Sequence, residues 1–239
     1  MAAVNGTSPK VTLYTNHGCP FAHRAHITIK ELGLEHEEVV IDLTKPRDPW
    51  YLDINPRGLV PTIDFNGHII TESAIVSQFL ADAYPSHLLP PADSVDNALK
   101  RARINFFTDT WNTKVGMSWM KIAMEDSKEE QEKLTKELVS TVEKEIDPLL
   151  SDAAPFFGGS SRLTFAEALV APMIIRLYAF AKDGLLPQSV ADGLDGLGNF
   201  SKWAAEVVKQ ESVTYIWDEE RTIQQTRTKL AQLKAKATH

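Results

Sequence analysis

A junction between a strand and a helix, at Cys19, constrains the fold of this chain more than any other stretch. Residues 11–14 alternate apolar and polar side chains, as a half-buried strand does, and apolar residues recur at helical spacing over 21–32. Pro20 suits the first position of that helix because its missing N–H would be unpaired there, and Gly33 suits a left-handed helix end. The sequence therefore predicts that Cys19 lies at the N-terminus of the first helix.

Cys19 is the only cysteine in the chain and is a candidate nucleophile. Unpaired backbone N–H groups and the positive end of the helix dipole both favour a thiolate at this position. Neighbouring side chains are expected to add positive or potentially positive charge: His17, His23, Arg24 and His26. The alternative is a small buried apolar side chain, the usual role of a lone cysteine. Because position 22 holds Ala22 rather than a second cysteine, any disulfide of Cys19 must involve an outside thiol.

The elements that follow predict a mixed sheet. Residues 38–42 have the pattern of a second strand, which a helical crossover would place parallel to the first. Three prolines predict a loop over 44–58. Two short apolar strands within 62–71 then flank an Asn-Gly pair, the sequence most typical of a tight hairpin, and a helix follows. This order of elements matches an α/β thioredoxin-like domain over residues 10–85.

The second half of the chain predicts an all-helical domain over residues 92–239, after a proline-rich linker at 85–91. Apolar and aromatic side chains recur at helical spacing over 95–124. Two sequences typical of helix N-termini follow at 127–130 and 164–167. Further helices with the same periodicity are expected at 200–208 and 220–236.

The composition excludes several classes of partner. Among 239 residues, 43% are hydrophobic, which is enough for a sizeable core, and the net charge of −7 offers no basic surface to nucleic acid or anionic membranes. The first nine residues lack the cationic and apolar regions of a signal peptide, and no apolar run reaches about 18 residues. We expect a cytoplasmic protein in a reducing compartment, consistent with one free thiol.

Three motifs follow one another between residues 19 and 75. They are Cys19–Arg24 (CPFAHR), Asn55–Pro61 (NPRGLVP) and Thr71–Ile75 (TESAI). In this order they resemble the glutathione S-transferase superfamily, most closely its omega-like, cysteine-type group, and the resemblance continues more weakly through the helical half. One position departs from the pattern: many omega-like proteins carry Glu or Gln where this chain has His23. A string similar to the first motif occurs in glutathionyl-hydroquinone reductases.

The resemblance implies a glutathione site. Val60 and Pro61 resemble the family's cis-proline turn, which offers the Val60 backbone to the cysteinyl part of glutathione as an added strand would. The Ser73 hydroxyl suits the γ-glutamyl carboxylate, and Glu72 suits the γ-glutamyl ammonium. The residues alone leave two simpler explanations open, namely a trans strand start at Pro61 and an ordinary helix cap at Ser73.

Further site residues are implied with less specific signals. Arg47 falls where omega-like proteins place a lysine for the glycyl carboxylate, although a solvated loop charge explains it almost as well. Phe21 would line the cysteinyl pocket or pack the helix against the sheet. The second substrate is expected between the two domains, against aromatic and methionine side chains: Trp111, Trp119 and Met120.

The main functional hypothesis is a redox enzyme with glutathione as its co-substrate. Cys19 would exchange glutathione with mixed disulfides or glutathionyl conjugates, as a thiol oxidoreductase and transferase does. One alternative is a conjugating transferase that adds glutathione to an electrophilic xenobiotic or biosynthetic intermediate, as in detoxification. The alternative from another class is a non-enzymatic glutathione-binding or regulatory module.

The expected partners are glutathione and a hydrophobic or electrophilic small molecule, and the resemblance implies a homodimer. No nucleic acid, membrane or metal is expected. His23 and His26 share one helix face, but two histidines without an acidic or cysteine partner seldom bind a metal, and no other constellation stands out among the seven histidines.

Overall fold

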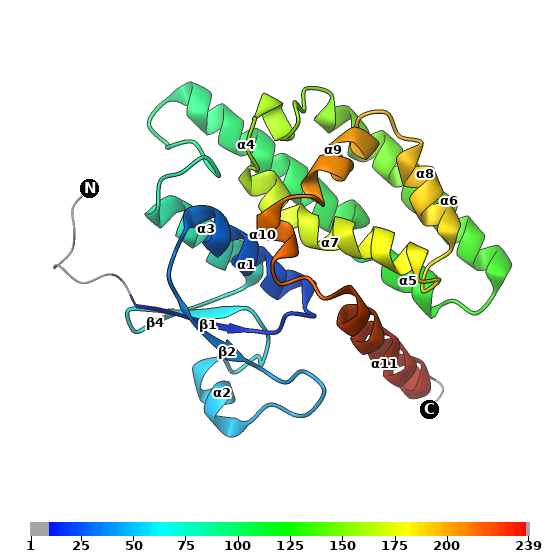
Figure 1. Cartoon of the computed structure of the whole chain (residues 1–239), viewed down its shortest axis with the longest axis horizontal. Coiled ribbons are helices and arrows are strands. Elements are labelled where there is room, and N and C mark those ends of the chain that lie inside the picture. The colour runs from blue at the N-terminus through cyan, green and yellow to red at the C-terminus, as the bar shows by residue number, and fades with distance from the viewer. Residues whose placement is uncertain (1–9, 238–239) are drawn as a thin grey trace.

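Four short strands form one mixed sheet in the computed structural model, which describes residues 10–237 (Figure 1). Their order across the sheet is β2-β1-β3-β4, with β1 and β2 parallel and the other pairs antiparallel. The strands are β1 (Val11–Thr15), β2 (Glu37–Val40), β3 (Thr62–Phe65) and β4 (His68–Thr71). The predicted second strand is therefore present but shorter than expected. The first nine residues, where the sequence predicts no signal peptide, lie outside the described part.

The predicted hairpin joins β3 to β4. Phe65 pairs with His68 across the turn, and the two turn residues both have positive φ, 52° at Asn66 and 86° at Gly67. A two-residue hairpin turn of type I′ needs this backbone conformation, which glycine and asparagine adopt most readily. The hairpin therefore forms for the reason that the sequence indicates.

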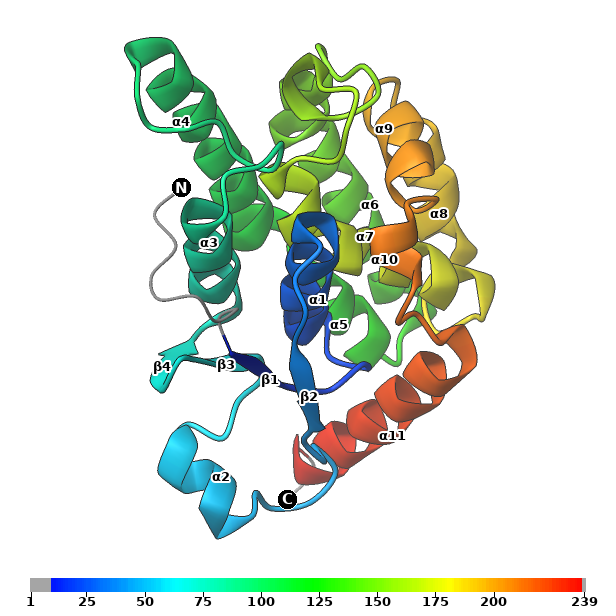
Figure 2. The same ribbon diagram turned by 60° about the vertical axis from the view of Figure 1, so that its left-hand side comes forward.

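Two helices cover one face of the sheet, and a third lies on the other side (Figure 2). The first two are α1 (Pro20–Leu32) and α3 (Ser73–Ala83), and the third is α2 (Pro49–Ile54). Helices α1 and α3 bury apolar side chains against β1 and β3. The predicted loop over 44–58 is wrong in its centre, because Pro49 begins α2 rather than interrupting a helix. The Tyr51 side chain then packs against Tyr14 of the sheet.

The C-terminal part consists of helices, as predicted, and α7 lies at its centre (Figure 1). The longer helices are α4 (Val95–Thr110), α5 (Ser118–Met124), α6 (Lys128–Glu145), α7 (Phe165–Lys182), α8 (Gln188–Asp195), α9 (Phe200–Val207) and α11 (Glu219–Ala237). Shorter segments are a π-helical turn at Trp111–Val115, η2 (Asp147–Leu150), η3 (Phe157–Gly159) and α10 (Glu211–Thr214). The continuous pattern over 95–124 is thus divided into α4, the π turn and α5. No helix within the described residues is long and apolar enough to cross a membrane.

A buried carboxylate fixes the start of α7. Thr164 caps the helix, and the fully buried Glu167 completes the predicted capping box by accepting from the Thr164 backbone N–H at 2.8 Å. The same carboxylate also accepts from Phe157 N–H at 2.8 Å and from Trp203 Nε1–H at 2.6 Å. Burial raises the pKa of Glu167, and these hydrogen bonds oppose that shift. Glu167 therefore joins three segments and sets the position of the helix that packs on α1.

We expect Glu167→Ala to lower the free energy of unfolding by about 2–4 kcal/mol, because it leaves several buried N–H groups without acceptors. Thr164→Ala should lower it by about 1 kcal/mol through loss of the helix cap. Urea unfolding followed by tryptophan fluorescence measures both effects. The exposed Glu137→Ala on α6 is the matched control and should stay within about 0.5 kcal/mol of wild type. A Glu167→Ala variant as stable as this control contradicts the assigned role.

Candidate active site

The turn between β1 and α1 is organised by Asn16, a residue that the sequence analysis missed. Its Oδ1 accepts from Gly18 N–H at 3.0 Å, its Nδ2 donates to Ile41 O at 2.9 Å, and its backbone carbonyl accepts from Cys19 N–H at 2.9 Å. Asparagine is a common turn former because its side chain bonds to the backbone two residues on. Cys19 follows in an extended conformation at the N-cap of α1, as predicted, and its side chain makes no capping bond.

The Cys19 sulfur faces the segment that precedes β3. Its Sγ lies 3.9 Å from Val60 O, and the Val60–Pro61 peptide bond is cis, as the resemblance implied. Two side chains, from α2 and its C-cap residue, fix the loop before Val60: the Tyr51 hydroxyl and the Asn55 amide both donate to Leu59 O, at 2.5 and 2.9 Å. Two motifs that lie 41 residues apart in the chain therefore meet at the sulfur.

The third motif forms the head of α3. Ser73 is the first residue of this helix and is 8% exposed. Glu72 precedes it with φ 71° and ψ 118°, a conformation that is uncommon outside glycine, and its carboxylate pairs with Arg57. Backbone strain of this kind costs on the order of 1–3 kcal/mol and concentrates at ligand-binding sites. The Glu72–Ser73 pair therefore remains the candidate clamp for the γ-glutamyl group of glutathione, as the resemblance implied.

Arg24 connects this clamp to the helical part. From α1, its Nη1 donates to Ser73 Oγ at 3.3 Å, its Nη2 to Asn112 Oδ1 at 2.6 Å and its Nε to Leu169 O at 2.7 Å. The guanidinium also lies over the Phe21 ring, 5.1 Å from its centroid. Burial lowers the pKa of Arg24 to about 10, so the group remains charged at neutral pH.

Arg176 reaches the Cys19 turn from α7, and the sequence analysis missed it. Its Nη2 donates to Gly18 O at 3.2 Å, and its guanidinium lies over the Trp217 ring at 4.9 Å. Its Nε is buried and has no hydrogen-bond partner among the described residues. Burial lowers the pKa of Arg176, whereas a negatively charged Cys19 sulfur would raise it. The sequence offered one indication of its role: Arg176 is the single charged residue between Glu167 and Lys182 in an otherwise apolar helix.

His23 supports Arg176 and adds no charge. It is fully buried, its Nε2 donates to Val213 O at 2.9 Å, and its Nδ1 accepts from Arg176 Nη1 at 3.2 Å. Burial, together with the charge of Arg176, holds the pKa of His23 well below its ordinary value. Burial likewise lowers the pKa of His26 to about 3. The prediction that these two histidines add positive charge near the sulfur is therefore wrong.

Arg47 closes the loop that leads to α2. Its Nε donates to Gly58 O at 3.0 Å, and its Nη1 donates to Asp42 O at 2.8 Å and to Lys45 O. These bonds hold the guanidinium between the second strand and the Val60 segment. Contact with a glycyl carboxylate stays a prediction.

The expected second-substrate residues divide into core and partly exposed positions. Trp111 is 0% exposed and stacks parallel to Phe200, with ring centroids 6.2 Å apart, so the prediction that it lines an open pocket is wrong. Trp119 is 8% exposed and packs on Phe180. Met120 is partly exposed. Helical spacing does not distinguish a core face from a cleft face, which explains the error at Trp111.

Comparison with known proteins agrees with this geometry. Residues 18–83 match a family model described as "Glutathione S-transferase, N-terminal domain". Glutathione S-transferase omega-1 of Rattus norvegicus is 32% identical over 171 residues, which are 71% of this chain and 68% of the rat protein. The Sus scrofa protein of the same name is 27% identical over 89% of this chain and 83% of its own length.

Two solved structures have similar folds over nearly their whole length. Rice GST1 in complex with glutathione is 25% identical with a TM-score of 0.80, over 97% of this chain and 99% of the rice chain. Glutathione transferase Omega 2C from Trametes versicolor is 27% identical with a TM-score of 0.77, over 93% of this chain and 99% of its own.

The buried neutral His23 makes stability depend on pH. An unfolded histidine takes up a proton near pH 6.5, whereas folded His23 does not, so the unfolded state binds more protons below that pH and stability falls. We expect His23 to contribute a loss of about 1 kcal/mol between pH 6.5 and 5.5.

Urea unfolding at pH 7.5, 6.5 and 5.5 tests this prediction. The variant His23→Gln should be less stable than wild type at pH 7.5 but should lose less stability as the pH falls. Equal pH slopes for the two proteins rule out His23 as a source of the pH dependence.

Proposed function

The chain belongs to the glutathione S-transferase superfamily, in its omega-like group, and from that premise we propose that Cys19 is the nucleophile of a glutathione-dependent thiol transferase. The carrying observation is the position of the Cys19 sulfur, at the N-cap of α1 and opposite Val60 O, with no capping bond to occupy it. The chain is a glutathione transferase, and the proposal concerns its chemistry.

The proposed reaction has two thiol exchanges. The Cys19 thiolate attacks the glutathione sulfur of a mixed disulfide, the S–S bond breaks, and the departing thiolate takes a proton from solvent. The thiolate of a second glutathione then attacks the glutathionyl sulfur, forms oxidised glutathione and releases the Cys19 thiolate. With a glutathionyl conjugate as substrate, the carbon leaving group takes the electron pair and a proton instead. Because the chain holds one cysteine, no internal disulfide competes with these steps.

The hydrogen bonds at Ser73 support its proposed role toward the γ-glutamyl carboxylate. Its Oγ accepts from Arg24 Nη1, so the hydroxyl hydrogen is left to be donated to an anion. The same charged guanidinium favours a carboxylate at the head of α3. Glu72 would bind the ammonium group, and the Val60 backbone the cysteinyl part.

The remaining assignments follow the family resemblance. We place glutathione in the unit of residues 10–85, with Arg47 near the glycyl carboxylate and Phe21 beside the cysteinyl part. The second substrate would lie against the helical unit of residues 92–239, near Trp119 and Met120. A cytoplasmic homodimer is part of the proposal. Exposed apolar side chains on α3 and α4 support a covered face there: Ile75, Leu99 and Phe106.

Intact mass spectrometry tests the role of Cys19. Wild type should gain one glutathione on treatment with oxidised glutathione and should lose it again with reduced glutathione. Cys19→Ser should gain none, and its turnover of a glutathione mixed disulfide should fall to the uncatalysed rate. If wild type forms no adduct and Cys19→Ser conjugates a model electrophile as fast as wild type, the chain is a conjugating transferase and the thiol-exchange proposal fails.

A pair of serines on α3 tests the glutathione site. Ser73→Ala should raise KM for glutathione about tenfold, equivalent to roughly 1.4 kcal/mol, because it removes a hydrogen bond to a charged group. Ser77→Ala is the matched control: its hydroxyl is buried one turn further along α3, has no hydrogen-bond partner among the described residues, and should leave KM unchanged. Equal KM values for the two variants remove Ser73 from the site.

A further inference from the structure

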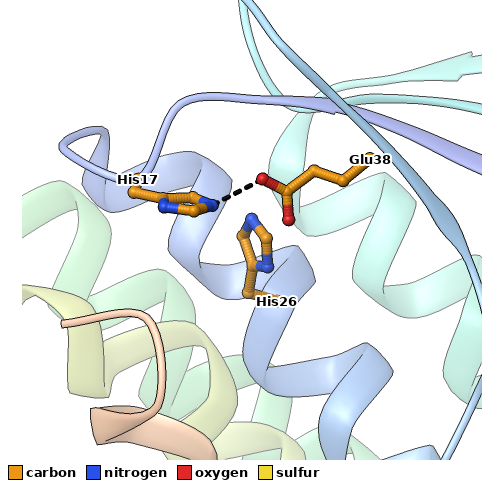
Figure 3. Close-up of side chains that lie close together, drawn as sticks. All are labelled: His17, His26 and Glu38. Carbon is orange, nitrogen blue, oxygen red and sulfur yellow. Dashed lines mark hydrogen bonds and ion pairs between the residues drawn. The ribbon is translucent and has the colours of Figure 1, made fainter.

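Three side chains of metal-binding type meet beside the Cys19 turn (Figure 3). They are His17 of the turn, His26 of α1 and Glu38 of β2. One ligand atom from each lies within 4.8 Å of the other two, and within residues 10–237 no other group of three or more such side chains meets this condition. The sequence did not predict the group, because Glu38 comes from a strand that pairs with β1 only in the fold.

The present contacts already bring the group together. His17 Nε2 lies 2.6 Å from Glu38 Oε1, and the His17 and His26 rings meet edge to face with centroids 5.2 Å apart. In Figure 3 the ring of His26 points upward between the other two side chains. The side chains of His17 and Glu38 are 32% and 30% exposed, so an ion has direct access from solvent.

Hydrogen bonds fix the tautomer of His26. The Tyr215 hydroxyl donates to His26 O at 3.2 Å, and because it has only one hydrogen, its oxygen accepts from His26 Nδ1–H at 2.9 Å. His26 Nε2 then carries a lone pair, which accepts from the Thr15 hydroxyl at 2.8 Å. A metal-binding histidine is normally oriented in this way, with its other ring nitrogen donating to a fixed outer partner.

We propose that His17, His26 and Glu38 bind a Zn²⁺ ion. Two imidazoles and one carboxylate, with a water in the fourth position, form a set of ligands that suits zinc, whereas Ca²⁺ and Mg²⁺ prefer all-oxygen sites. Zinc bonds of about 2.0–2.2 Å in a tetrahedron place ligand atoms roughly 3.4 Å apart. His17 and Glu38 therefore move slightly apart, and His26 Nε2 exchanges the Thr15 hydroxyl for the ion.

The ion joins the Cys19 turn, α1 and β2, and it uses none of the side chains assigned to glutathione. Its expected effect is on the stability of the sheet and its first helix, because an ion that binds only the folded chain stabilises it by mass action. The site is therefore a structural metal site, and its test is independent of the proposed thiol exchange.

Zinc titration of the metal-free Cys19→Ser protein against a chromophoric chelator tests the proposal without interference from the thiol. We expect one Zn²⁺ per chain, and a rise in melting temperature of roughly 5–10 °C at a hundredfold excess over Kd. Absence of stoichiometric binding in Cys19→Ser, with binding retained in wild type, assigns the ion to the thiol and overturns the proposal.

Variants of the proposed zinc ligands, and of a histidine–carboxylate pair outside the site, complete the test. In the Cys19→Ser background, His17→Gln and Glu38→Gln should abolish the shift, and Tyr215→Phe should weaken binding about 10–100-fold by freeing the His26 ring. The matched control is His87→Gln, which breaks another histidine–carboxylate pair, with 2.8 Å between His87 Nε2 and Glu31 Oε2. This variant should leave the zinc affinity and the zinc-induced rise in melting temperature unchanged. Unchanged zinc affinity in Glu38→Gln overturns the proposal.

Discussion

The site depends on two buried arginines, one on α1 and one on α7, each of which donates a hydrogen bond to the backbone of the other helix or of the turn before it. Arg24 of α1 donates to Leu169 O of α7, and Arg176 of α7 donates to Gly18 O of the turn before α1. Neither forms an ion pair with a carboxylate in the part of the chain that the structure describes. A buried cation without an anion is costly, since carbonyl dipoles offset only part of its lost hydration. The pair therefore favours a negative group at the site, and a negatively charged sulfur at Cys19 would stabilise both guanidinium charges.

The neutral state of His23 follows from the same constraint. His23 accepts a hydrogen bond from Arg176, so a proton on that nitrogen would remove the bond and place two cations in contact. Burial and the guanidinium thus act together on the pKa of His23. His23, the residue that departs from the omega-like pattern, orients Arg176 and places no positive charge near the Cys19 sulfur. This explains how His at that position is compatible with the rest of the motif.

The sequence predicted the parts of the site that depend on local backbone rules or on a motif. Cys19 at the N-cap, the Asn66–Gly67 hairpin and the cis bond before Pro61 are of this kind. The errors concern information that only packing supplies. Helical periodicity could not show that the Trp111 ring is enclosed by the helical core. Nor could it place Arg176 against a turn from which it is separated by more than 150 residues.

The β1–α1 turn presents its side chains and its backbone to different neighbours. Gly18 O is held by Arg176 and Gly18 N–H by Asn16, while Cys19 faces Val60 and the His17 ring faces Glu38 on the β2 side. Because the backbone is held on both sides, the His17 ring can change its partner by rotating about its own bonds without moving the sulfur. A turn fixed in this way can carry a nucleophile and a metal ligand two residues apart, with little coupling between them.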